Sequence, residues 1–82
     1  MKTLYFTTAI FNRYRIRFLF GLNEVTLEPY YIGKNKNGKK VIYGRVNGIN
    51  EIRGFEFEKI SNIKILGYEK FSPIIPIMLI YR

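Results

Sequence analysis

The Asn37-Gly38 dipeptide is the feature that most constrains how this chain can fold. Both residues tolerate the positive backbone φ of a tight turn, and a turn of this kind between two alternating segments is the strongest short-range signal of a β-hairpin. Residues 25–32 precede the turn and residues 40–46 follow it, and side chains in both segments alternate in character. The sequence therefore predicts two antiparallel strands joined at this dipeptide.

The segment before the turn contains a proline. Its alternation places Leu27 and Tyr31 on one side of the predicted strand and Glu28 and Ile32 on the other. Pro29 cannot donate a hydrogen bond to a neighbouring strand, so we expect an edge or a bulge at this position.

Another alternating segment begins at Tyr14. Apolar side chains occupy every second position as far as Phe20, and Arg15 and Arg17 lie between them. A period of two is that of a β-strand, so we predict one core face and one basic face for this strand.

Two further alternating segments, residues 52–58 and 63–66, predict a fourth and a fifth strand. A short helix over residues 9–12 is expected before the first strand, because the hydroxyl of Thr7 or Thr8 can cap it. Short strands joined by turns favour a mainly β fold, specifically a small five-stranded barrel with one short N-terminal helix.

The composition limits both size and chemistry. The chain has 82 residues, 48% of them hydrophobic, which suits one core and predicts a single domain over residues 1–82. It contains no Cys and no His, and its six acidic residues are all Glu. Cysteine nucleophiles, histidine-based catalysis and the common zinc sites are therefore excluded. We predict a protein that is not an enzyme and needs neither cofactor nor metal.

The two ends of the sequence suggest a cytoplasmic protein. Charges at Lys2 and Arg13 leave no room for a signal-peptide core, so export is not expected. The apolar run at residues 74–81 is far shorter than the ~20 residues of a spanning helix, so no membrane insertion is expected. We predict that this C-terminal tail, residues 74–82, is shielded in the core or in a homo-oligomer, where it could add a strand to a neighbouring sheet edge.

The charge of the chain suggests an anionic partner. Its net charge of +8 attracts polyanions, and basic groups combined with aromatic rings hold single-stranded nucleic acid without sequence preference. Tyr30 and Tyr68 are candidates for an aromatic platform of this type. The residues predicted to bind single-stranded nucleic acid or a nucleotide are Arg15, Arg17, Tyr43, Arg45, Arg53 and Lys59. The same charges also suit the solvated faces of ordinary strands, and Glu28 suits a structural acceptor for a nearby arginine.

A series of short motifs resembles the WYL domain family. The motifs occur in the family's order, as Ala9-Ile10, the basic strand at residues 13–20, Glu28-Pro29, Asn37-Gly38, the segment 55–60 and Phe71. The resemblance implies an Sm-like β-barrel that senses a ligand or binds nucleic acid, usually beside a DNA-binding domain and sometimes free-standing. This chain resembles a divergent, free-standing member.

Two segments depart from the family pattern. Lys40-Val41-Ile42 stands where the family has the Trp-Tyr-Leu of its name, which removes the aromatic signature. In the segment 55–60, Glu56 and Lys59 stand where the family has arginines, so an acid beside a point charge replaces a bidentate phosphate clamp.

Two functional hypotheses follow from the sequence. The first is a non-catalytic, regulatory module that senses a ligand or binds a nucleotide or nucleic acid. The alternative is a protein-interaction or assembly module that uses edge-strand pairing through the apolar tail, with its positive charge serving solubility.

Overall fold

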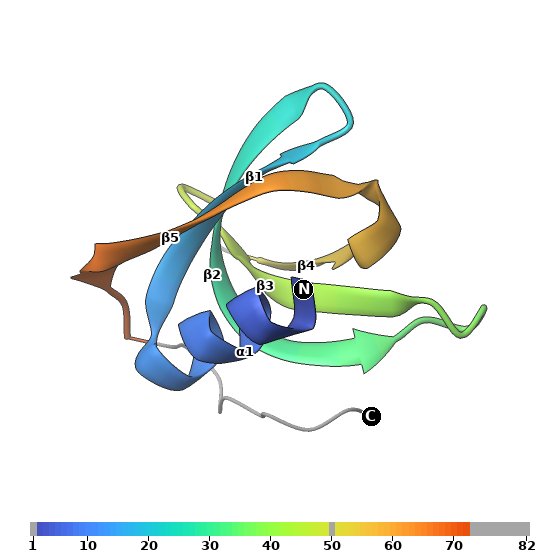
Figure 1. Ribbon diagram of the computed structural model, residues 1–82, viewed down its shortest axis with the longest axis horizontal. Coiled ribbons are helices and arrows are strands. Elements are labelled where there is room, and N and C mark those ends of the chain that lie inside the picture. The colour runs from blue at the N-terminus through green and yellow to red at the C-terminus, as the bar shows by residue number, and fades with distance from the viewer. Residues whose placement is uncertain (1, 50, 73–82) are drawn as a thin grey trace.

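The computed structural model describes residues 2–49 and 51–72 of the chain. The elements in this part are α1 (Lys2–Asn12), β1 (Tyr14–Phe20), β2 (Asn23–Lys34), β3 (Lys40–Val46), β4 (Ile52–Glu56), the 3-10 helix η1 (Phe57–Lys59) and β5 (Ile60–Lys70). The five strands form one antiparallel sheet in the order β4-β3-β2-β1-β5. Figure 1 shows that this sheet is strongly curved and that α1 lies against it. The predicted mainly β fold with one N-terminal helix is confirmed.

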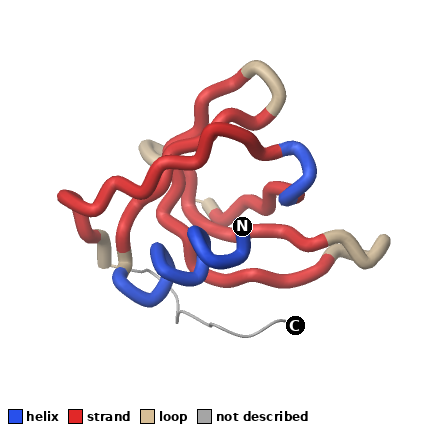
Figure 2. Tube along the Cα trace, viewed as in Figure 1, coloured by secondary structure: helices blue, strands red, loops and turns tan. Residues whose placement is uncertain are grey.

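The sheet is open in the part of the chain that the structure describes. β4 and β5 are its edge strands, and no ladder of hydrogen bonds joins them there. The turn η1 connects them along the chain (Figure 2). Five strands and their approximate places were therefore predicted correctly, whereas closure of the sheet into a barrel stays a prediction.

The main core lies between α1 and the inner face of the sheet. Phe6, Ala9 and Ile10 have the i, i+3, i+4 spacing of one helix face, and all three are buried. Strand residues that pack with them include Ile16, Phe18, Leu27, Ile32, Ile42 and Phe55. The ring of Phe6 meets that of Phe57 edge-on, with 4.9 Å between the centroids.

This packing corrects the prediction for the helix. A helix over residues 9–12 with a threonine cap was wrong, because α1 already begins at Lys2. The additional turns allow Phe6 to enter the core, and the Nζ of Lys2 donates a hydrogen bond to the carbonyl of Phe57 at 2.5 Å. Burial of an apolar face stabilises a helix more than a capping residue does, and that burial depends on strands distant in the sequence.

The hairpin at Asn37-Gly38 is confirmed. Gly38 has φ 77°, and its backbone N–H donates to the carbonyl of Asn35 at 2.9 Å. The side-chain oxygen of Asn35 also accepts hydrogen bonds from the backbone N–H groups of Asn37 and Lys39. A glycine in the left-handed region and an Asx side chain thus close the turn together.

The bulge at Pro29 is also confirmed, and it changes the face on which later residues lie. The register of β2 against β3 shifts between Pro29 and Tyr31. Ile32 consequently enters the core, whereas Tyr31 pairs with Tyr43 on the opposite face. The predicted assignment of these two β2 residues to faces was therefore wrong, because one extra residue in a strand reverses the alternation beyond it.

Three strand boundaries differ from those expected. β2 extends to both sides of residues 25–32, and β4 ends at Glu56 because the chain turns into η1. β5 begins at Ile60 and continues to Lys70, well beyond residues 63–66.

The C-terminal tail, residues 74–82, lies outside the described residues, so the predictions for it stay predictions. Within the described residues, no helix has the length and apolar character needed to cross a bilayer.

Side chains that alternate with the core residues lie on the face of the sheet away from the main core, which we call the outer face. Cross-strand partners share a face, so the register identifies its members. They include Arg15 and Arg17 on β1, Thr26, Glu28 and Tyr31 on β2, Tyr43 and Arg45 on β3, Gly54 on β4, and Lys64 and Leu66 on β5.

Candidate functional site

A buried glutamate joins two of the predicted binding residues. Glu28 is 0% exposed, and Arg45 is its direct cross-strand partner. The Nε of Arg45 lies 3.0 Å from Oε1 of Glu28, and its Nη2 lies 3.1 Å from Oε2. The Nη2 of Arg15 approaches the same Oε2 at 3.1 Å from the opposite side. The expectation that Glu28 accepts from a nearby arginine is confirmed.

The arrangement around Glu28 is asymmetric with respect to solvent. The side chain of Glu28 is 1% exposed, whereas those of Arg15 and Arg45 are 23% and 28% exposed. Hydrogen bonding to Glu28 raises the pKa of the Arg45 guanidinium above its usual range, so this group stays charged. Among the described side chains, two cations thus surround one carboxylate at this point of the outer face.

Arg17 lies next to another cation. It pairs across β1 and β5 with Lys64, and its other neighbour, on β2, is Thr26. Neither Arg17 nor Lys64 forms an ion pair with a described carboxylate. Like charges placed directly opposite each other on neighbouring strands destabilise a sheet.

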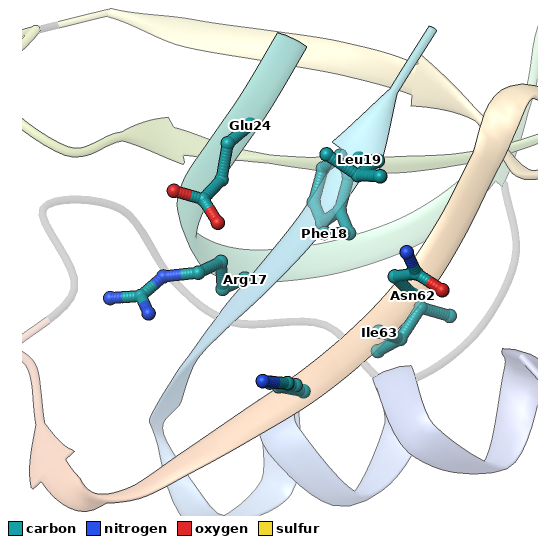
Figure 3. A pocket seen from close by; sticks show the side chains of 7 residues that line it. Arg17, Phe18, Leu19, Glu24, Asn62 and Ile63 are labelled. Atoms are coloured by element: carbon teal, nitrogen blue, oxygen red, sulfur yellow. The ribbon is translucent and has the colours of Figure 1, made fainter. Parts of the chain in front are cut away.

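A hollow of about 410 Å³ lies beside these two cations, lined by Arg17, Phe18, Leu19, Glu24, Asn62, Ile63 and Lys64. It forms where the register of β1 against β5 shifts between Arg17 and Leu19, and Asn62 has φ 53° at this irregularity. Figure 3 shows Arg17 and Glu24 extending from neighbouring strands to the same side of the hollow. Two cations and one carboxylate line it, so its charge is net positive.

The tyrosines of the predicted platform lie in different environments. Tyr43 is half-buried on the outer face, with its ring centroid 4.8 Å from that of Tyr31. Tyr30 is 0% exposed and stacks on Phe71, so it presents no ring to a ligand. The side chain of Tyr68 lies outside the described part of the chain. Tyr31, and not Tyr30, is therefore the tyrosine of β2 that lies beside Tyr43 on the outer face.

The remaining predicted residues lie elsewhere. Arg53 pairs with Gly44, one position away from the Arg45–Ile52 pair, so Arg53 and Arg45 leave the sheet on opposite faces. The Nη2 of Arg53 lies 2.7 Å from a carboxylate oxygen of Glu51. Lys59 is in η1, with its Nζ 3.6 Å from a carboxylate oxygen of Glu56. The outer face thus brings together Arg15, Arg17, Tyr43 and Arg45, but neither Arg53 nor Lys59.

Sequence reasoning missed Lys64 and Tyr31. The position of Lys64 beside Arg17 depends on pairing between strands that are far apart in the chain, for which the sequence contains no local signal. The position of Tyr31 depends on the bulge. Pro29 predicted a bulge, but it did not show which residues the bulge would move to the other face.

Within the described residues, no cluster of acidic side chains could hold a metal ion.

Comparison with known proteins shows the fold. No protein-family model and no curated protein matches the chain. Its structure is similar to proteasome accessory factor B/C (PafBC) of Arthrobacter aurescens, with a TM-score of 0.71 and 21% sequence identity. The match covers 83% of this chain and 12% of that protein, so this chain corresponds to a small part of it. The likeness is consistent with the WYL-like fold that the sequence suggested, and membership of that family stays a prediction.

Proposed function

We propose that this chain is a non-catalytic, WYL-like module that binds single-stranded nucleic acid or a nucleotide through the outer face, with the Arg17–Lys64 pair as its phosphate contact. The observation that carries the proposal is the direct opposition of these two cations, without a described carboxylate partner, beside a hollow of about 410 Å³. A bound phosphate would neutralise their mutual repulsion.

Two further observations support this function. Positive charge continues from the pair along the outer face, because Arg15 and Arg45 are partly exposed around a buried Glu28. PafBC, a small part of which has a similar fold, contains a WYL domain, and the WYL resemblance implies a ligand-sensing or nucleic-acid-binding role. We also propose that the module has a regulatory role and that its sheet closes into an Sm-like barrel.

The proposal is tested by measuring the binding of a fluorescein-labelled, single-stranded oligonucleotide by anisotropy across a salt series. Each phosphate contact to a single strand contributes about −0.7 to the slope of log affinity against log salt. The double variant Arg17→Ala with Lys64→Ala removes this one phosphate contact, so it should weaken binding at least tenfold at low salt and make the slope less negative by about 0.7.

A matched control separates a site from general positive charge. Arg53→Ala with Lys59→Ala removes the same charge from residues that the outer face does not bring together, and it should change affinity less than about threefold. An equal loss in both double variants would indicate general attraction to the basic surface. Unchanged binding in the Arg17 and Lys64 variant would place the site elsewhere.

A further inference from the structure

Two stacked tyrosines lie further along the outer face. The rings of Tyr31 and Tyr43 are 4.8 Å apart between centroids and 17° from parallel, and both side chains are half-buried. Neither makes a hydrogen bond or ion pair within the described residues. Two half-buried, stacked aromatic rings form a flat surface that another planar group can extend.

Glycines on both neighbouring strands make room for Tyr43. A Cβ added at Gly54 on β4 would lie 2.7 Å from Cε1 of Tyr43, and one added at Gly33 on β2 would lie 3.3 Å from Cε2. Real Cβ contacts are essentially never as short as the first distance. The ring therefore lies low over the sheet between two positions without side chains, and its setting depends on both glycines.

The path from the tyrosines to the Arg17–Lys64 pair is positively charged. Thr26 is the neighbour of Arg17 on β2, and the strand between Thr26 and Tyr31 spans about 16 Å at a rise of about 3.3 Å per residue. Arg15 and Arg45 lie between these points with their guanidinium groups partly exposed, while the carboxylate of Glu28 is buried. A single strand of a few nucleotides covers this length, which is at the lower end of the ~4–16 nucleotides that one OB-fold binds.

We propose that Tyr31 and Tyr43 form a base-stacking site for single-stranded nucleic acid, on which one base stacks while a phosphate nearby in the same strand lies at Arg17 and Lys64. This inference rests on the proposed function, and it adds that Tyr31 and Tyr43 recognise a base of the bound strand. Stacking on tyrosine accepts every base, since each has a π-face, so the site would not select a sequence.

The test compares two labelled oligonucleotides of equal length on the unaltered protein, an oligothymidylate and a strand whose central nucleotides are abasic. Both carry the same phosphates, so they differ only in the bases available for stacking. We expect the oligothymidylate to bind at least about fivefold more tightly, since stacking of one base contributes a factor of this size or more. Tyr43→Leu should remove this preference while leaving the affinity for the abasic strand and its salt dependence in place.

The control variant is Tyr5→Leu, which removes a 49% exposed tyrosine from α1 and should keep the preference. Equal binding of both strands by the unaltered protein would overturn the stacking site while leaving phosphate binding intact. Loss of the preference in Tyr5→Leu as well would also overturn it. Absence of binding to either strand would overturn the proposed function together with this inference. The comparison on the unaltered protein needs no variant to fold.

Discussion

Arg15 and Arg17 are two positions apart on one strand and point to the same face, yet they have opposite surroundings. Arg15 shares an oxygen of the buried Glu28 with Arg45. Arg17 faces Lys64 beside a hollow. A charge that contacts a buried opposite charge is required by the fold, because burial leaves that partner without water.

The Arg17–Lys64 pair makes no ion pair with a described carboxylate. Two like charges in direct cross-strand register oppose folding slightly, and under the proposed function a bound phosphate would offset this cost. Two arginines on the same face of one strand therefore need not have the same role. Arg15 contacts a buried carboxylate, whereas Arg17 lies opposite another cation.

The largest expected effect on stability comes from removing the buried carboxylate of Glu28, which Arg15 contacts. Glu28→Ala leaves two partly buried guanidinium groups facing each other and should lower the free energy of unfolding by about 3 kcal/mol. Chemical denaturation measures this loss. Glu24→Ala, at an exposed glutamate on the same strand, should change it by less than about 0.5 kcal/mol. A similar loss in both variants would mean that Glu28 has no special structural role.

An intermediate effect is expected from converting the like-charged pair into an ion pair. Lys64→Glu places a carboxylate opposite Arg17 and should raise the free energy of unfolding by about 0.2–1 kcal/mol. It should also weaken oligonucleotide binding at least tenfold, which corresponds to about 1.4 kcal/mol. Lys34→Glu makes the same change of charge on the exposed end of β2 and should produce neither effect. Stabilisation without loss of binding would contradict the proposed site.

The smallest effect concerns a surface pair away from the outer-face arginines. The Nζ of Lys39 lies 2.9 Å from a carboxylate oxygen of Glu58, and this contact lowers the pKa of Glu58 and raises that of Lys39. Because the folded pKa of Glu58 is depressed, its contribution to stability is present above its ordinary value of about 4.5 and is lost as the pH falls through the folded value. The contribution of Lys39 is lost only at alkaline pH, above its ordinary value of 10.5.

Melting temperatures across a pH series test this assignment. Lys39→Met should melt slightly below the unaltered protein near neutral pH, and the difference should vanish in acid once Glu58 is protonated in the folded state. Lys36→Met, on the same hairpin, should show no such convergence. A difference for Lys39→Met that persists into acid would mean that the contact contributes nothing measurable.

Local patterns predicted much of the sheet and part of the site. The alternation after Tyr14, the Asn37-Gly38 turn and the bulge at Pro29 depend on neighbours in the chain, and all three are found in the structure. The alternation also placed Arg15 and Arg17 on one face, as the register shows. These features could be predicted because backbone conformation and side-chain period are properties of short segments.

The sequence by itself determined which segments are strands, where the hairpin turns and which side of β1 is basic. Only the tertiary structure decided that α1 begins at Lys2 and that Arg17 pairs across the strands with Lys64. It also decided that Glu28 accepts hydrogen bonds from Arg15 and Arg45. Each of these contacts joins residues that are distant in the chain, and a bulge can reverse the face of every residue beyond it. Charge is visible in a sequence, but the partner that gives a charge its role is set by how the strands pair.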